Sequence, residues 1–197
     1  MPRRARLLVA VLACIALAGG GAALWLSRSN APEAETSAVQ IGGPFQLIDM
    51  QGRPVSEKTL LGKPTAIFFG FTYCPEICPT TLAEMTRWLK ALGKDGDRLN
   101  AVFVSVDPER DTPEQMRLYL ANFDPRIQGF TGAPEQVAAI AKAYRVYFRK
   151  VPTEGGGYTV DHSAAVYLFD AKGRFIEPIG YGTPPDRAIQ QLKSLLR

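Results

Sequence analysis

The sequence predicts a three-layer α/β fold with a mixed sheet, and two observations support this prediction. First, short continuous apolar runs, typical of strands buried on both faces, alternate with stretches whose apolar residues recur at helical spacing. Second, further strand-like segments are joined in pairs by short turn sequences, which adds hairpins to the parallel strands. Such an alternation places helices on both faces of one sheet.

The first predicted elements are a hairpin, a buried strand and a helix. Residues 44–56, PFQLIDMQGRPVS, predict the hairpin, with Gln51-Gly52 at its turn. Residues 64–71, PTAIFFGF, predict the buried strand. The helix that follows has apolar residues at helical spacing and ends at two glycines: Leu82, Met85, Leu89 and Leu92, then Gly93 and Gly96.

A second buried strand and two helices come next. Residues 99–107, LNAVFVSVD, predict the strand. Residues 112–123, TPEQMRLYLANF, predict a helix with Thr112 as its N-cap, Pro113 in its first turn and Gln115 completing a capping box. A further helix is predicted over residues 134–147.

The last elements are a second hairpin and a closing helix. Residues 164–170 and 173–180 flank a turn at Ala171-Lys172-Gly173, and residues 184–196 predict an amphipathic helix. This order of elements is that of thioredoxin, with extra strands at the N-terminus and an inserted helix. We therefore predict one thioredoxin-like domain over residues 41–197, without internal repeats.

Residues 1–27 are predicted to form a basic tail and a transmembrane anchor. Residues 7–26 carry no charge, and their number is about that needed to cross a ~30 Å hydrocarbon layer as a helix. Three arginines precede this stretch and favour a cytoplasmic N-terminus. Trp25 suits the headgroup region at the far end of the span. Residues 28–40 are small and polar, which predicts a flexible linker.

Two alternatives for this N-terminal segment stay open. One is a cleaved secretory signal, although the apolar stretch exceeds the usual length and Gly20-Gly21-Ala22 is a poor cleavage site. The other is a lipoprotein acylated at Cys14, although apolar residues continue well beyond that cysteine. No Arg/Ser-rich amphipathic presequence precedes the span, which favours a bacterial inner membrane, with the domain in the periplasm.

The charge of the chain argues against a nucleic-acid partner. The formal net charge is +4, but Arg3, Arg4 and Arg6 precede the apolar stretch, and the rest of the chain has 20 basic and 19 acidic residues. The predicted domain is therefore nearly neutral and lacks the basic stripe of a nucleic-acid-binding protein.

Three distant segments are expected to meet at one rim of the sheet. Cys74 and Cys78 follow the first buried strand, while Asp107 ends the second strand, with Asp111 four residues later. The carboxyl ends of parallel strands lie at one edge, where ligand sites gather. His162 precedes residues 164–170, which we expect to run antiparallel, so this histidine lies at the same edge. The sequence therefore predicts a site of two thiols, one imidazole and two carboxylates.

Each of these residues also has a purely structural interpretation. A bridge between Cys74 and Cys78 would close a very small loop and stabilise the fold less than a long-loop disulfide. Asp107 would merely end its strand, and the negative charge of Asp111 would interact favourably with the positive N-terminal end of the helix that Thr112 caps.

A peroxiredoxin-type peroxidase is disfavoured, because Phe71 stands where that class has a threonine.

The spacing of the cysteines favours metal binding over simple dithiol exchange. Redox-active dithiols usually have two intervening residues, but Cys74 and Cys78 have three, about one helical turn. Both sulfurs can then point toward one external ion. Two thiolates and one imidazole form a soft set that suits copper(I) and, with an added oxygen, copper(II). Zinc would require a fourth protein ligand or a water, and an iron–sulfur cluster would require more cysteines.

Three motifs together resemble those of the SCO/SenC family, which are membrane-anchored copper chaperones with a thioredoxin-like domain. The motifs are FGFTYCPEICPTTL, VFVSVDPERDTPE and VDHSAAVYLFD, in that order, and the resemblance covers residues 41–197. It implies that Cys74, Cys78 and His162 hold copper. Asp107 and Asp111 match the acidic loop of the family, which implies a supporting role around the ligands or an oxygen ligand for copper(II). Asp161 is a further supporting candidate.

The resemblance also implies a function and partners. Family members deliver copper to the binuclear copper site of cytochrome c oxidase or reduce its cysteines, so the expected partner is the copper-accepting subunit of the oxidase. Another copper chaperone or a thiol reductase would be a further partner. Two alternatives to a copper chaperone stay open: a thiol–disulfide reductase, in which Cys74 and Cys78 are the redox pair, and a copper or redox sensor.

Overall fold

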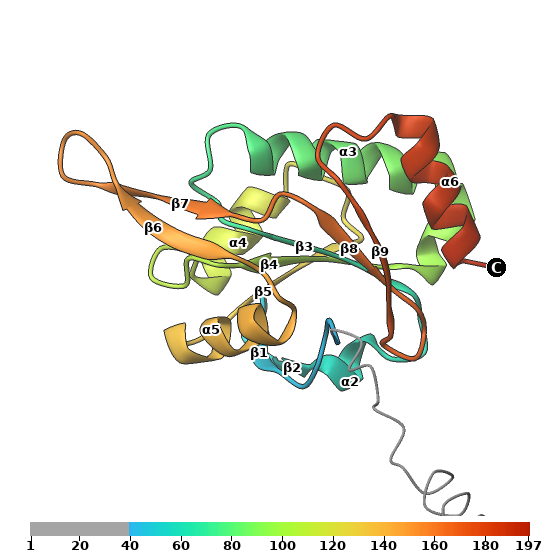
Figure 1. The fold of residues 1–197 in the computed structure, drawn as a ribbon, viewed down its shortest axis with the longest axis horizontal. Helices are drawn as coiled ribbons and strands as arrows, with labels where there is room; N and C mark the ends of the chain where they lie inside the picture. The colour runs from blue at the N-terminus through green and yellow to red at the C-terminus, as the bar shows by residue number, and fades with distance from the viewer. Residues whose placement is uncertain (1–39) are drawn as a thin grey trace, which may run out of the picture. The chain divides into compact units, whose positions relative to one another are not determined.

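A computed structural model of the chain describes residues 40–197, which form one compact unit (Figure 1). The predicted transmembrane helix and most of the linker lie outside these residues. The strands are β1 (Gln46–Asp49), β2 (Pro54–Ser56), β3 (Thr65–Gly70), β4 (Asn100–Ser105), β5 (Ile127–Thr131), β6 (Phe148–Pro152), β7 (Tyr158–His162), β8 (Val166–Phe169) and β9 (Phe175–Ile179). The helices are α2 (Glu57–Leu60), α3 (Ile77–Leu92), the 3-10 helix η1 (Gly93–Arg98), α4 (Pro113–Leu120), α5 (Pro134–Ala143) and α6 (Pro185–Leu195).

A seven-stranded mixed sheet organises the domain, with strand order β2-β1-β5-β4-β3-β8-β9. Strands β3, β4 and β5 are parallel, whereas β8 runs antiparallel to β3 and pairs with β9 as a hairpin. The N-terminal hairpin β1–β2 joins the sheet through β1 and β5. The predicted mixed sheet and the antiparallel direction of the strand after His162 are therefore confirmed.

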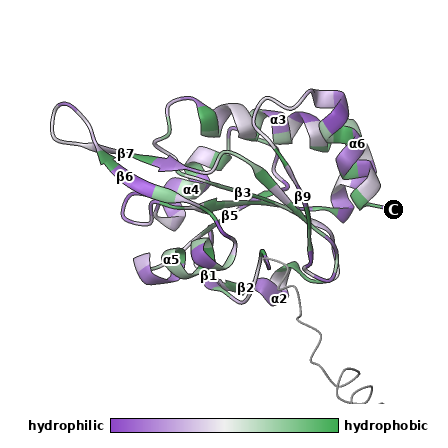
Figure 2. Ribbon diagram, viewed as in Figure 1, coloured by the Kyte–Doolittle hydropathy of each residue, from purple (hydrophilic) through white to green (hydrophobic). Residues whose placement is uncertain are grey.

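Helices cover both faces of the sheet, which completes the three predicted layers. Every residue of β3 is buried, because this strand lies at the centre between the two helical layers. The Phe103 ring of β4 packs against Tyr119 of α4, with ring centres 6.1 Å apart. On the opposite face the Phe69 ring lies 5.7 Å from that of Tyr144, just after α5. Apolar residues gather in the central strands, and the helices show hydrophilic residues on their outer sides (Figure 2).

Both hairpins of the main sheet use the same turn sequence, Asp-x-x-Gly-Arg. The Asp49 carboxylate accepts hydrogen bonds from the backbone N–H groups of Gln51 and Arg53, both 2.9 Å, and from Arg53 Nε at 2.7 Å. Asp170 repeats these three contacts in the β8–β9 turn. The glycine of each turn has a φ of 76°, a left-handed value that glycine adopts without steric cost. The two predicted hairpins are thus confirmed.

The structure differs from the prediction in several places, and three of these concern the main elements. Helix α5 ends at Ala143 rather than near residue 147, because Arg145 takes a φ of 56° and Val146 N–H bonds back to the Ala141 carbonyl. Strand β5 was not predicted, since its glycine and glutamine interrupt the apolar pattern. The separate hairpin β6–β7 was also not predicted; it extends away from the main sheet (Figure 1).

Within residues 40–197, none of the helices combines the length and apolar character required to span a bilayer. The transmembrane helix predicted over residues 7–26 falls outside this part of the chain and stays a prediction.

The turn carboxylate of Asp49 predicts a pH-dependent contribution to stability. Burial raises the pKa of Asp49, but hydrogen bonds from Arg53 and Gln51 outweigh it, so the pKa lies below its usual 3.8. The charged form therefore stabilises the fold above about pH 4. We expect Asp49→Asn to lower the unfolding free energy by about 1–2 kcal/mol at pH 7. Because the wild-type advantage is lost as the pH falls through the depressed pKa, the difference should shrink below pH 4.

Urea unfolding of the wild type and of Asp49→Asn between pH 7 and pH 3 measures the difference in their unfolding free energies. The exposed Glu154, which lies in the turn of the β6–β7 hairpin, provides a control, and Glu154→Gln should change little. An Asp49→Asn effect that stayed constant across this range would contradict the explanation.

Candidate metal centre

The two cysteines lie where strand β3 passes into helix α3. Cys74 is half-buried in the connecting loop, whereas Cys78 is fully buried in the first turn of the helix. The backbone N–H of Cys78 donates a hydrogen bond to Cys74 Sγ at 3.3 Å. Both thiols are free. An amide of the first helical turn thus points at the Cys74 sulfur, where it stabilises negative charge.

Gly70, the last residue of β3, provides the space for the Cys78 sulfur. A Cβ atom at this position would lie 2.7 Å from Cys78 Sγ and 2.8 Å from the Phe103 ring. Both distances are well below van der Waals contact. A side chain at position 70 would therefore displace Cys78 from its present position.

The imidazole of His162 comes from the end of β7 and approaches the same sulfur. Its Nε2 atom lies 3.4 Å from Cys78 Sγ, although the two residues are 84 positions apart. On the other side of the ring, Nδ1 lies 2.9 Å from the Ser163 carbonyl oxygen. Because a carbonyl only accepts, Nδ1 must carry a proton, and the neutral tautomer with this proton presents the Nε2 lone pair toward the sulfurs.

Two phenylalanine rings fix the plane of this imidazole. Phe71 meets it edge-on, with ring centres 5.7 Å apart and an interplanar angle of 89°. Phe68 lies 6.1 Å away at 62°. The ring is therefore oriented by packing as well as by the hydrogen bond to Ser163.

One group of candidate metal-binding side chains is found in the described part of the chain. Its possible ligand atoms, on Cys74, Cys78 and His162, all lie within 4.8 Å of one another. Two sulfurs bound to one ion at about 2.3 Å are at most about 4.6 Å apart, so the group needs only a small adjustment to hold an ion. Cys74 and His162 also line a cleft that gives access from solvent.

The two thiols have opposite shifts in pKa. The pKa of Cys74 is lowered, because hydrogen bonds from the Cys78 thiol and the Cys78 backbone N–H stabilise its thiolate more than burial disfavours it. The pKa of Cys78 is raised, because its proton is shared with Cys74, its sulfur is buried, and the neighbouring thiolate is negative. The pair thus holds one thiolate and one thiol until an ion displaces the second proton.

The two predicted carboxylates of the acidic loop are fully buried, but neither belongs to the group of three. Asp107 accepts hydrogen bonds from Arg110 Nε and, at 2.8 Å, from the Tyr158 hydroxyl of β7. Arg110 also donates to the Tyr158 carbonyl and lies over the Tyr158 and Tyr73 rings, at 3.9 and 4.9 Å. Asp107 therefore connects the acidic loop with the hairpin that carries His162.

Asp111 connects the acidic loop with the loop that carries the cysteines. Its carboxylate accepts hydrogen bonds from the Thr72 hydroxyl at 2.7 Å, from the Thr72 N–H at 3.1 Å and from the Ser105 hydroxyl at 2.6 Å. Burial raises the pKa of Asp111 in spite of these hydrogen bonds. Asp161 is instead exposed at the rim of the cleft and pairs with Arg149 at 3.3 Å.

Several residues that shape the site were not predicted from the sequence. Gly70 was visible only as the end of a buried strand. Arg110 lies inside the quoted acidic motif, but its charge gave no indication that it reaches β7. Tyr158 and Phe68 carried no signal, because their roles depend on how distant strands are placed.

The fold and the site define a thioredoxin-like domain with a dithiol–imidazole cluster at the rim of its sheet. The chain belongs to the SCO1/SenC family, whose model matches residues 33–197. Protein SCO2, mitochondrial, of Saccharomyces cerevisiae is 36% identical over 200 residues, which cover 95% of this chain and 66% of that protein. The chain spans less than two thirds of the length of this relative and of two other curated relatives, of which the matches cover 42% and 55%.

Two solved structures extend the comparison. Bradyrhizobium japonicum ScoI with copper bound is 52% identical, with a TM-score of 0.74; the match covers 79% of this chain and 99% of that one. The second structure is that of BsSco, a member of the Sco family of cytochrome c oxidase assembly proteins, in which a disulfide switch has been identified. It is 28% identical to this chain, with a TM-score of 0.64. That match covers 80% of this chain and 94% of BsSco.

The close approach at Gly70 predicts that even a methyl group there disturbs the site. Gly70→Ala should lower the unfolding free energy by about 1–3 kcal/mol, because overpacking forces side chains off their preferred positions. It should also make the Cys78 thiol react faster with a thiol reagent. Urea unfolding and reaction with a chromogenic disulfide measure the two effects.

Gly180→Ala is the matched control, since a Cβ there would meet only Thr183 at 3.8 Å. If the two variants had equal stability and equal thiol reactivity, the packing role of Gly70 would be wrong.

Proposed function

We propose that the chain binds one copper ion through Cys74 Sγ, Cys78 Sγ and His162 Nε2 and delivers it to the binuclear copper site of cytochrome c oxidase. The observation that carries this proposal is the meeting of two sulfurs and a ring nitrogen from distant segments. The copper-bound ScoI and the oxidase-assembly role of the family of BsSco support it.

The chemistry of the three donors suits copper better than other ions. Thiolates are soft ligands that prefer copper(I), and three donors satisfy its low coordination number. Zinc in a structural site takes four protein ligands, and residues 40–197 offer no fourth ligand within this group. Copper(II) would be accepted with an added oxygen ligand.

Delivery requires that the ion be reachable by the ligands of an acceptor. Cys74 is only half-buried, and it lines the cleft together with His162. An incoming ligand can therefore reach a three-coordinate ion from the cleft before a sulfur of the chaperone leaves. Such exchange needs no free copper and keeps the transfer barrier low.

The three aspartates are proposed to support the ligands rather than to bind the ion. Asp107 and Arg110 hold the β7 hairpin, and with it His162, against the acidic loop. Asp111 holds the start of the cysteine loop at Thr72. Asp161 lies at the rim of the cleft, where its carboxylate can pair either with Arg149 or with a group of an approaching partner.

Localisation is part of the proposal and rests on the sequence. We propose that residues 7–26 anchor the chain in a bacterial inner membrane, with the linker over residues 28–40 and the copper domain in the periplasm. The acceptor would then be the copper-accepting subunit of the oxidase, at the same membrane. Another copper chaperone or a thiol reductase would supply the ion or keep the cysteines reduced.

Thiol–disulfide reduction of oxidase cysteines is the second candidate function. The lowered pKa of Cys74 and the adjacent Cys78 thiol are the features of an exchanging pair. Oxidation of the pair would block copper binding, because the ligands must be thiolates. The reduced pair can thus either give up a bound copper ion or, by closing a Cys74–Cys78 disulfide, give two electrons to a disulfide of the acceptor.

Replacement of the histidine distinguishes the two functions. His162→Ala should weaken copper(I) binding by more than about 100-fold, because loss of an outer partner alone costs 10–100-fold in metal affinity. Thiol–disulfide exchange with glutathione should remain. Competition titration of the reduced protein with a copper(I) chelator measures the affinity.

Thr159→Ala, a substitution in the wall of the same cleft, is the control and should bind copper as the wild type does. Unchanged copper affinity in His162→Ala would contradict the proposed ligand set and favour a plain dithiol exchanger.

A further inference from the structure

We propose that the end of the domain opposite the metal centre rests on the anionic headgroups of a phospholipid bilayer. This end, the basic pole, is a cleft lined by four basic residues, Lys63, Arg98, Lys172 and Arg197. Copper binding does not involve these residues. The proposal therefore goes beyond copper delivery and rests only on the anchor proposed over residues 7–26.

The basic pole and the metal centre lie at opposite ends of strand β3. Lys63 comes just before the strand begins at Thr65, whereas Cys74 follows its end at Gly70. The six residues of β3 span about 20 Å. The C-terminus, which belongs to the basic pole, and the β6–β7 hairpin, which carries the histidine, lie at opposite ends of the ribbon (Figure 1).

The lysines of the basic pole are not neutralised by the acidic residues that line the same cleft. Asp97 and Asp170 are each paired with another residue, an arginine, at 3.2 and 2.6 Å. Arg98 is itself close to an aspartate, at 3.7 Å. The Lys63 ammonium donates to the Asp97 carbonyl oxygen at 3.1 Å, and Lys172 is exposed. Both lysines therefore present positive charge to the solvent.

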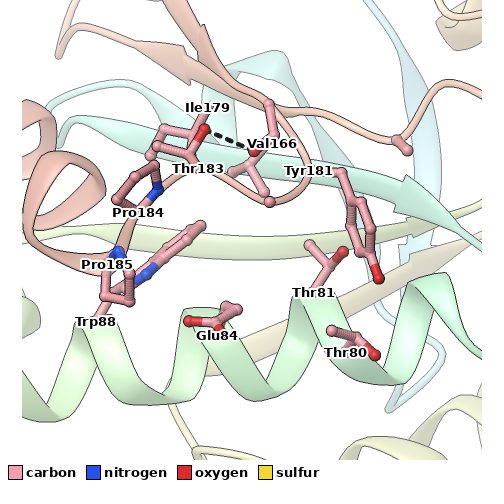
Figure 3. A pocket seen from close by; sticks show the side chains of 13 residues that line it. Thr80, Thr81, Glu84, Trp88, Val166, Ile179, Tyr181, Thr183, Pro184 and Pro185 are labelled. Carbon is pink, nitrogen blue, oxygen red and sulfur yellow. Dashed lines mark hydrogen bonds between the residues drawn. The ribbon is translucent and has the colours of Figure 1, made fainter.

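Two other clefts of the domain carry acidic rather than basic side chains. The carboxylates of Glu76 and Asp161 line the cleft of the metal centre. Among the described residues that line the cleft between α3 and the turn from β9 to α6, Glu84 is the charged one (Figure 3). An anionic surface would therefore attract the basic pole and repel the end that carries the metal centre.

An exposed leucine beside the lysines favours a bilayer over a soluble anion. Leu61 is 48% exposed and lines a neighbouring cleft together with Lys172. Lysines next to an apolar side chain suit the boundary between headgroups and acyl chains, where their stems contact lipid and their charges contact phosphates. A soluble anion would satisfy the lysines but would leave Leu61 in water.

The chain also enters the domain at this end. Gln40, the first described residue, lines the same cleft as Leu61 and Lys172. The thirteen residues of the predicted linker, 28–40, extend at most about 45 Å, so the proposed anchor keeps the basic pole close to the bilayer. Tethering raises the effective concentration of the surface, and a few weak contacts are then sufficient for docking. The metal centre would face away from the bilayer.

The first test measures how accessible individual lysines are in the full-length chain, held in lipid nanodiscs. Discs of phosphatidylcholine are compared with discs that also contain anionic phosphatidylglycerol, and mass spectrometry gives the acetylation rate of each lysine. Lys63 and Lys172 should react about tenfold more slowly in the anionic discs, because headgroups cover them. Lys150, on β6 at the other end, should react equally in both.

High salt should remove the protection of Lys63, because it screens the attraction between the lysines and the headgroups. Equal reaction rates of Lys63 in the two kinds of disc at low salt would overturn the proposal.

Variants test the contribution of single residues. Lys172→Gln should weaken the protection of Lys63 about fivefold, the effect of one charge near an anionic surface. Leu61→Ser should weaken it as well. The matched controls, Arg117→Gln and Leu118→Ser, replace an exposed basic and an exposed apolar residue of α4 and should leave the protection unchanged. Full protection in Lys172→Gln would contradict the assigned surface.

Inorganic phosphate separates a bilayer surface from a site for a soluble anion. Added to phosphatidylcholine discs, phosphate should not protect Lys63, and protection there would overturn the assignment to a bilayer. A chain that did not stay with the discs would overturn the proposed anchor together with this proposal. Copper(I) affinity should be the same in both kinds of disc, because the metal centre lies at the other end of β3.

Discussion

The hydrogen bond from His162 Nδ1 to the Ser163 carbonyl is the interaction on which the metal centre depends. It fixes the proton on the far side of the ring and leaves Nε2 as a lone-pair donor, 3.4 Å from Cys78 Sγ. The two phenylalanine rings hold the imidazole in the same orientation. Without this tautomer the ring would present an N–H to the sulfurs and could not bind an ion there.

The scaffold brings the ligands together through buried acidic side chains. Parallel β3 and β4 end at one edge, and Asp107 and Asp111 follow β4. One carboxylate holds the cysteine loop at Thr72, and the other holds the histidine hairpin through Arg110 and Tyr158. Because hairpin β6–β7 lies outside the main sheet, these contacts, more than strand pairing, position His162 relative to the cysteines.

Much of this arrangement could be predicted from sequence because it depends on local pattern and on sheet direction. The buried strands of β3 and β4 appeared as continuous apolar runs, and the two main hairpins as turn sequences with glycine. The meeting of Cys74, Cys78 and His162 followed from the common edge of parallel strand ends and an antiparallel strand start. Local chemistry and topology were sufficient for these features.

The rest depends on contacts between distant residues that no local pattern encodes. Strand β5 interrupts its apolar pattern at Gln128 and Gly129, where Leu120 and Met116 fill the space of a side chain. Gly70 matters only because α3 places Cys78 over it. The acidic loop was expected around the ligands, but its partners, Arg110 and Tyr158 among them, became visible only once the hairpin was placed.

X-ray absorption at the copper edge of the copper(I)-loaded, reduced chain tests the central claim most directly. The proposed centre predicts one copper per chain, with two sulfur neighbours and one imidazole nitrogen. A centre with sulfur neighbours only would contradict it, because His162 would then not be a ligand.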